Sequence, residues 1–177
     1  MGRHGIPLAF AAACALLGCG GGARPGGTAA ATALSYAGPT DTTQWRLVAN
    51  PSSTASHLVL DLLAPDGASG MGVTLVLAVD PARAAWSGAG PVDGGTYAAP
   101  LARWSSLRGG ELRILLSQEN PTPPVAYAGP VLSVALDLAP GAAPGQAALA
   151  TSQGGHLAAP LTVPVPVTIL AGALTAR

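Results

Sequence analysis

Two histidines, His57 and His156, are the candidate general bases for acid–base chemistry in the main part of the chain. Nucleophilic catalysis needs such a base beside a serine or cysteine, with an acid that orients the ring. His57 falls on the expected solvent face of an alternating segment, near Asp61, and His156 follows a Gly-Gly pair in an expected turn. Neither a Gly-x-Ser-x-Gly motif nor a paired-histidine zinc spacing is present in the sequence. The sequence therefore predicts two solvated histidines and a protein that is not an enzyme.

Acidic residues, the usual ligands of calcium, are spread singly along the chain. A calcium site needs several oxygen ligands at short spacing, and the nearest cluster is Gln118-Glu119-Asn120. We interpret that cluster as part of a loop, so the sequence predicts neither a metal ion nor a cofactor. The scattered carboxylates are Asp61, Asp66, Asp80, Asp93, Glu119 and Asp137.

The N-terminal segment carries the clearest chemical motif of the chain. A short basic start precedes an uncharged run over residues 6–17, which is too short to cross a bilayer as a permanent helix. The run ends in Leu16-Leu17-Gly18-Cys19, which resembles the lipobox of bacterial lipoproteins. The resemblance implies transfer of a diacylglycerol to the Cys19 thiol, cleavage after Gly18 and acylation of the new amino terminus. An ordinary secretory signal with a chance cysteine is the alternative.

Lipidation at Cys19 would place the protein in the cell envelope, because several acyl chains hold a protein on a membrane essentially permanently. In Gram-negative lipoproteins an aspartate after the cysteine commonly retains the protein in the inner membrane, and Gly20 stands there instead. The resemblance therefore favours the outer membrane over the inner membrane. We expect a signal peptide over residues 1–18, a flexible Gly- and Ala-rich tether over 19–34 and a single domain over 35–177.

Composition excludes several classes of partner. The chain has eight arginines, no lysine, eight acids and a formal net charge of zero, so the sequence predicts neither nucleic-acid binding nor a charged substrate. Cys14 leaves with the expected signal peptide and Cys19 is expected to carry lipid, so the domain has no disulfide although it is exported. Its stability must therefore come from an apolar core, and we expect a monomer.

Apolar residues alternate with period two along most of the chain, which is the pattern of strands with one buried and one wet face. The clearest segments are residues 58–64, 73–79, 112–116 and 132–138, with turn-forming residues between them. About eight strands at this spacing predict an all-β fold, a two-sheet antiparallel β-sandwich with minimal helix. The weaker candidate strands are residues 44–49, 101–106, 146–151 and 162–170.

Proline and aspartate positions predict two local features. Asp80 is suited to cap a short helical turn over residues 80–86, because Pro81 follows it at the first helical position. Pro164 and Pro166 remove two N–H groups from the same side of the last expected strand. That strand is therefore expected at the edge of a sheet.

Two stretches of the chain resemble cohesin domains. Residues 72–81, an apolar strand that runs into an Asp-Pro turn, are similar to one cohesin segment. Residues 129–136, with the Pro144-Gly145 turn and the strand over 146–150, are similar to a later part of that family. The resemblance implies a cohesin-like, immunoglobulin-like sandwich that binds a partner protein across one face of a sheet.

An interaction surface is expected where apolar residues point away from the core. Leu115, Val131 and Ala135 have the outward phase of their strands, and Arg113 and Ser133 share it. If the two strands are neighbours, these residues form an apolar centre with a polar rim, the usual anatomy of an interface. The sequence thus predicts a non-catalytic protein-interaction module whose partner is an unknown protein.

Aromatic side chains indicate an alternative function, that of a carbohydrate-binding module held at the envelope. Trp45 shares the apolar phase of its strand and Trp86 ends the expected turn, so both are expected in the core. Tyr97 and Trp104 fall in a weakly patterned region and are the candidates for exposure. An exposed coplanar pair of aromatic rings would favour a polysaccharide as the partner.

Overall fold

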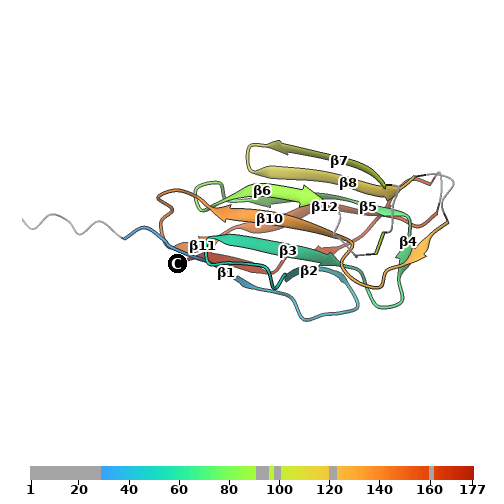
Figure 1. The fold of residues 1–177 in the computed structure, drawn as a ribbon, viewed down its shortest axis with the longest axis horizontal. Helices are drawn as coiled ribbons and strands as arrows, with labels where there is room; N and C mark the ends of the chain where they lie inside the picture. Colours follow the sequence, from blue (N-terminus) through green and yellow to red (C-terminus); the bar gives the residue numbers. More distant parts are fainter. Residues whose placement is uncertain (1–28, 91–95, 98–100, 120–122, 160–161) are drawn as a thin grey trace, which may run out of the picture.

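The protein is described here by a computed structural model, in which strands account for the regular structure of the described residues (Figure 1). The expected signal peptide and Cys19 lie outside the described residues. Within the described part of the chain, no helix is long and apolar enough to cross a membrane. The predicted all-β class is confirmed. The described residues are 29–90, 96–97, 101–119, 123–159 and 162–177.

Two five-stranded sheets form the body of the fold. Sheet I has the order β14 (Ile169–Leu170), β2 (Trp45–Ala49), β3 (His57–Leu63), β10 (Leu132–Leu138) and β6 (Ala84–Gly90). Sheet II has the order β13 (Val165–Pro166), β12 (Leu149–Leu157), β5 (Gly72–Val79), β8 (Glu111–Gln118) and β7 (Leu101–Arg108). Neighbouring strands are antiparallel, except that β14 runs parallel to β2.

Two small sheets lie towards opposite ends of the sandwich, as the labels β11 and β4 in Figure 1 show. One small sheet has the order β1 (Leu34–Ala37), β15 (Ala173–Ala176) and β11 (Gly145–Ala147). The other pairs β4 (Ser69–Gly70) with β9 (Val125–Ala126). The described chain thus contains fifteen strands, more than the expected number of about eight, because several segments change sheet partway along their length.

The core lies between the two sheets and follows the alternation of the sequence. On β5, Val73, Leu75 and Leu77 are buried, whereas Thr74 and Val76 point to the outside and are half-buried. The inward phases predicted for the four clearest segments are confirmed, because each strand presents every second side chain to the core. The largest fully buried side chains are Leu47, Leu60, Leu62, Leu75, Leu77, Leu116, Leu132, Leu136, Leu174, Val73, Val131 and Val134.

The proline-rich segment near the C-terminus confirms one expectation and corrects another. Strand β13 lies at the edge of sheet II, as the prolines predict, and the N–H of Val167 donates to the Gly154 carbonyl at 3.0 Å. Residues 162–170 do not form one strand, however. Ile169 and Leu170 pair with β2 of sheet I, so the segment crosses from one sheet to the other. It is also not the last strand, since β15 follows it.

The segment after Asp80 is mainly a strand and not a helical turn. Asp80 does cap a turn, because its Oδ1 accepts the N–H of Ala82 at 3.0 Å. Strand β6 then begins at Ala84 and extends to Gly90. Strand β6 was not predicted from the sequence, because its alanines and glycines have low strand propensity and its apolar pattern is weak. Trp86 is buried in the core, as expected.

The ordered domain begins earlier than the expected boundary at residue 35. Ala31 is buried, and its N–H donates to the Ala142 carbonyl at 2.7 Å. The N–H groups of Thr32 and Ala33 both donate to the carbonyl of Arg177. Residues 31–34 therefore belong to the sandwich and not to the expected tether. The beginning of the domain lies beside the C-terminal end of the chain (Figure 1).

Candidate interaction face

The expected interaction face is divided between two sides of the molecule. Arg113 and Leu115 lie on β8 in sheet II, whereas Ser133 and Ala135 lie on β10 in sheet I. The outward phases of these strands point away from each other, because the two sheets pack with their inner faces together. The prediction that these residues form one surface is therefore wrong.

Val131 was expected on the same face, and the structure buries it. Its side chain is only 1% exposed, and its N–H donates to the Leu62 carbonyl at 2.8 Å. Val131 lies at a bend just before β10 begins at Leu132. The alternation of that strand therefore does not extend to this residue, and its assignment to the outer surface is wrong.

The outer face of sheet II presents a row of neighbouring side chains across four strands. Trp104 of β7 lies opposite Leu115 of β8, Leu115 lies opposite Thr74 of β5, and Thr74 lies opposite Gly155 of β12. Trp104 is 55% exposed and Leu115 is 36% exposed. We call these four residues the apolar row. They place an exposed tryptophan ring on the edge strand β7 beside an exposed leucine on its neighbour β8.

A second row of residues runs beside the apolar row and is more polar. Ser106 of β7 lies opposite Arg113 of β8, and Arg113 lies opposite Val76 of β5, which in turn lies opposite Gln153 of β12. A shallow hollow of about 210 Å³ lies between the two rows. It is lined by Thr74, Val76, Trp104, Arg113, Leu115 and Gln153, together with Leu75 and Ile114.

Gly155 leaves the β12 end of the apolar row without a projecting side chain. A Cβ at this position would lie 2.5 Å from Oγ1 of Thr74 and 3.0 Å from Cβ of Pro164. Such distances are too short for a side chain unless its neighbours move. A glycine at this point therefore allows β13 and β5 to flank β12 closely and leaves the surface without a projecting side chain.

Charge on this face is concentrated at one side of the apolar row. Arg113 Nε donates to Oε1 of Glu111 at 2.7 Å, on the same strand. The Arg113 side chain is 58% exposed, so this ion pair contributes little to stability. The two rows together therefore give an apolar centre with a polar and charged border, which is the arrangement common in protein interfaces.

The outer face of sheet I has a different character, because its polar groups are bonded to one another. Asp61 was expected to point to solvent, but it is only 6% exposed. Its Oδ2 accepts Nδ2 of Asn50 at 2.7 Å, and its Oδ1 accepts the hydroxyl of Ser133. On the same strand, Nδ1 of His57 contacts Oδ1 of Asp137. Ser133 is thus part of a structural network that fixes three strands.

The aromatic residues near β4 form a cluster that the sequence did not indicate. Tyr97 is only 7% exposed, so the expectation that it lies at the surface is wrong. Its ring packs edge-on against Tyr127 at 5.9 Å, and their hydroxyls lie 3.2 Å apart. Tyr127 also packs against Trp45 and His156, with ring centroids at 5.4 and 5.7 Å. We call these four residues the aromatic cluster.

His156 is held inside the aromatic cluster and is not a solvated turn residue, as had been expected. It belongs to β12, and its Nε2 is buried without a hydrogen-bond partner among the described residues. Burial lowers the pKa of the His156 imidazole below its ordinary value. Gly70 is required beside it, since a Cβ there would lie 2.2 Å from that Nε2.

The described residues bring together neither a metal site nor a pair of exposed aromatic rings. No group of three histidine, cysteine or acidic side chains lies close enough to hold a metal in the part of the chain that the structure describes. Trp104 is exposed, as the sequence suggested, but Tyr97 is not, so these two residues do not form the exposed coplanar pair that would favour the carbohydrate-binding alternative. The two candidate histidines are not brought together. His57 of β3 in sheet I contacts Asp137, whereas His156 of β12 in sheet II packs against Trp45.

Comparison with known proteins identifies the architecture. No family model and no curated protein matches the chain. Among solved structures, the sixth cohesin of scaffoldin B from Acetivibrio cellulolyticus, solved in complex with a dockerin, is similar over 74% of this chain and 96% of that chain, with 14% identity and a TM-score of 0.50. The cohesin module of a family 33 glycoside hydrolase from Clostridium perfringens is similar over 77% and 99%, with 11% identity and a TM-score of 0.45. The likeness to the scaffoldin cohesin concerns the fold alone and, with the two packed sheets, shows a cohesin-like sandwich, as the sequence predicts.

Proposed function

We propose that this protein is a non-catalytic protein-interaction module that binds its partner through the outer face of sheet II. The observation that carries the proposal is the apolar row, in which Trp104 and Leu115 are exposed side by side. Tryptophan and arginine are the residues that most often dominate binding energy at interfaces. Here Arg113 borders the exposed tryptophan across one shallow hollow.

The contrast between the two sheets supports this choice of face. On sheet I the outward polar groups, Asp61 and Ser133, are bonded to each other, and Asp61 is buried. On sheet II the outward groups include exposed apolar surface that no described residue covers. Exposed apolar area next to polar groups is the surface that gains most free energy when a partner covers it. The cohesin-like fold also supports a protein as the partner.

The proposal includes attachment to the outer membrane through lipid on Cys19. It is supported by the match of Leu16-Leu17-Gly18-Cys19 to the lipobox and by Gly20 after the cysteine. Nine residues, 20–28, lie between Cys19 and the first described residue. This length is enough for a flexible Gly- and Ala-rich connection between the lipid and the sandwich.

Photo-crosslinking in cells tests which face binds a partner. Thr74 and Ala135 are a matched pair, because each is a half-buried outward residue in an inner strand of its sheet. We expect p-benzoylphenylalanine at Thr74 to give a discrete crosslinked species, and the same group at Ala135 to give none. Crosslinks only from Ala135 would place the interaction on sheet I and refute the proposal. Loss of the Thr74 crosslink on Trp104→Ala would identify the apolar row as the binding surface.

A further inference from the structure

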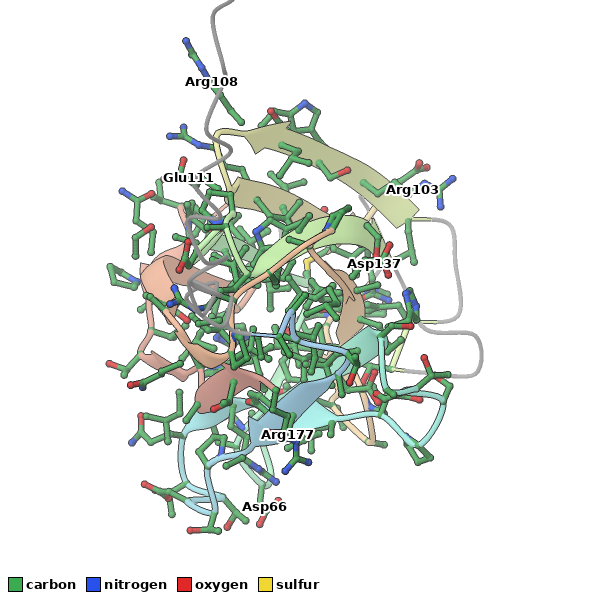
Figure 2. All side chains as sticks on the ribbon, turned by 90° about the vertical axis from the view of Figure 1, so that its left-hand side faces the viewer. Asp66, Arg103, Arg108, Glu111, Asp137 and Arg177 are labelled. Atoms are coloured by element: carbon green, nitrogen blue, oxygen red, sulfur yellow. The ribbon has the colours of Figure 1, made fainter. Side chains whose placement is uncertain are left out.

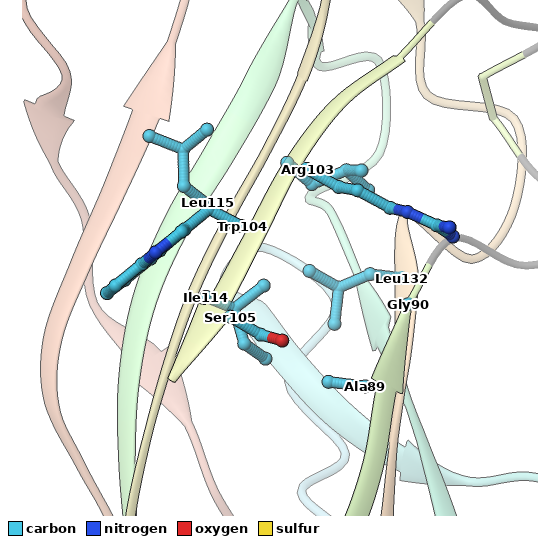
Figure 3. Close-up of a pocket in the computed structure, with 9 residues that line it drawn as sticks. Ala89, Gly90, Arg103, Trp104, Ser105, Ile114, Leu115 and Leu132 are labelled. Carbon is cyan, nitrogen blue, oxygen red and sulfur yellow. The ribbon is translucent and has the colours of Figure 1, made fainter. Parts of the chain in front are cut away.

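The sandwich is open along the edge where β6 and β7 face each other. Among the described residues, each of these strands pairs on one side only, β6 with β10 and β7 with β8. A cleft of about 390 Å³ lies between them, and a hollow of about 200 Å³ continues it along the same edge (Figure 3). Ala89, Gly90 and Leu132 form the sheet I wall of the cleft, and Arg103, Ser105 and Ile114 line the sheet II wall. Trp104 and Leu115 of the apolar row also line the cleft, so the cleft adjoins the outer face of sheet II.

The cleft exists because the residues of β6 are too small to fill it. Ala89 lies opposite the buried Val134 and therefore has the inward phase of β6, so this strand presents only a methyl group to the cleft at that position. On the opposite wall, Leu107 has the inward phase of β7 and is nevertheless 56% exposed. An inward-facing leucine with this exposure shows that the core is uncovered at this edge.

The free edge of β7 also presents backbone groups to the cleft. Gly109 and Gly110 both have positive φ angles, 59° and 83°, so they form a type I′ turn between β7 and β8. Such a two-residue turn closes on a hydrogen-bonded pair, which here is Arg108 and Glu111. Because hydrogen-bonded pairs alternate along the ladder, the N–H and C=O groups of Arg103, Ser105 and Leu107 point away from β8.

Strand β7 lacks the prolines and the short length that protect the opposite edge of sheet II from pairing, although Arg103 places one charge on its inward phase. The opposite edge of sheet II, β13, is two residues long and is flanked by prolines. Strand β7 has eight residues and contains neither proline nor glycine. A long edge strand of this kind is a ready template for a further strand.

Charge on the two strands that border the cleft has a single sign. Strand β7 carries Arg103 and Arg108, and neither β6 nor β7 contains an acidic residue. Figure 2 shows the two arginines towards opposite ends of β7, and Arg103 is one of the residues that line the cleft. Glu111 lies opposite Arg108, but it is bonded to Arg113. The edge is therefore suited to a partner that carries carboxylates.

We propose that the free edge of β7 binds an extended acidic peptide as an added strand, with alternate apolar side chains in the cleft. The peptide backbone pairs with Arg103, Ser105 and Leu107, and its apolar side chains enter between Ala89 and Ile114. In recognition by strand addition, main-chain hydrogen bonds give affinity, and pockets for alternate side chains give specificity. The carboxylates of the peptide lie near Arg103 and Arg108.

A second copy of this chain is a poorer occupant of the same edge. Two β7 strands side by side would bring four arginines together without a carboxylate from either β6 or β7. Like charges placed opposite each other destabilise a strand pair. The site also goes beyond the proposed function, since a strand added at the edge leaves Thr74 and Val76, in the middle of the outer face, uncovered.

Fluorescence anisotropy with a defined peptide tests the proposal on the purified full-length chain. The probe is fluorescein-labelled Glu-Val-Thr-Val-Thr-Val-Thr-Val-Glu, and the matched probes carry lysine in place of glutamate or N-methyl groups on the valines. We expect each matched probe to bind about tenfold more weakly or worse, because it lacks the charge or the backbone donors. Ser105→Pro removes one edge N–H without removing a bond to β8, and should weaken binding to a similar extent. Ser105→Ala keeps that N–H and should bind within about twofold of the unmodified chain.

A second variant keeps the test decisive if Ser105→Pro lowers the thermal midpoint. Ala89→Phe fills the cleft from β6 without changing β7, and should weaken binding of the valine peptide in the same way. Equal binding of the three probes, no binding of the first, or no effect of both Ser105→Pro and Ala89→Phe would overturn the proposal. A concentration-dependent dimer that Ser105→Pro abolishes would show that the edge pairs with a second copy, and would also overturn it. Unchanged peptide binding by Thr74→Asp separates this site from the outer face of sheet II, because Thr74 lies on that face and does not line the cleft.

Discussion

Leu75 and Leu115 allow a direct test of the two faces of sheet II, because they are the same residue type on neighbouring strands. Leu75 on β5 is 1% exposed and points into the core, whereas Leu115 on β8 is 36% exposed and points outwards. Truncation of a fully buried leucine removes its transfer free energy and leaves a cavity, at a cost of about 2–5 kcal/mol. We expect Leu75→Ala to lower the free energy of unfolding by this amount.

Leu115→Ala should cost much less, because the side chain already contacts solvent and its loss leaves no closed cavity. We expect a decrease of about 1 kcal/mol in the free energy of unfolding. Urea unfolding followed by tryptophan fluorescence measures both variants, and the dependence of the free energy on urea should be the same in each. Leu75→Ala should also lower the thermal midpoint by about 5–15 °C in a domain of this size. Equal losses for the two variants would refute the outward placement of Leu115 and, with it, the interaction face.

The remaining predictions concern partner capture, pH and lipid attachment. Leu115→Asp should abolish partner capture while stability stays within about 1 kcal/mol, and a large loss of stability would assign Leu115 to the core. Because burial lowers the pKa of His156, the unfolded chain binds more protons than the folded one. The contribution of His156 to the free energy of unfolding should therefore be fully present above the ordinary pKa of 6.5 and should fall as the pH drops towards the folded-state pKa. His156→Gln should reduce this pH dependence in unfolding titrations, and an unaltered pH profile would contradict the burial of His156. By intact mass, the membrane-extracted protein should begin at Cys19 with added acyl mass. The variant Cys19→Ala should remain an unprocessed precursor. A lipid-free amino terminus at another residue would exclude this anchor.

Local alternation was enough to predict which side of a strand is buried. Leu75 and Thr74 are neighbours in the sequence, and the period of a strand alone assigns them to opposite faces. The same alternation placed Trp45 in the core. The missing N–H groups of Pro164 and Pro166 placed the segment that contains β13 at an edge. These features depend on a few consecutive residues, so a single sequence contains the information needed to predict them.

The partners of each strand are set by contacts between distant residues, and the sequence did not predict them. Strands β8 and β10 have similar alternation, and nothing within either one indicates that they belong to different sheets. Tyr97 was misplaced for the same reason, because its burial depends on Tyr127, thirty residues later. Trp104 was recognised as a candidate, but Thr74 and Val76 became part of the face only once the register of β5 against β8 was known.

The pairing of the first and last strands decides how the domain responds to mechanical load. Leu34 lies opposite Ala176 in the antiparallel pair of β1 and β15, so both ends of the described domain leave from the same end of that pair. Force applied between these two ends would separate the pair one bridge at a time, which needs little force. Force applied between the N-terminal end and a partner on sheet II would pull on the Leu34 end of β1 and leave the Ala176 end of β15 without load. A pull through a bound partner would therefore act on this pair differently from a pull between the two ends.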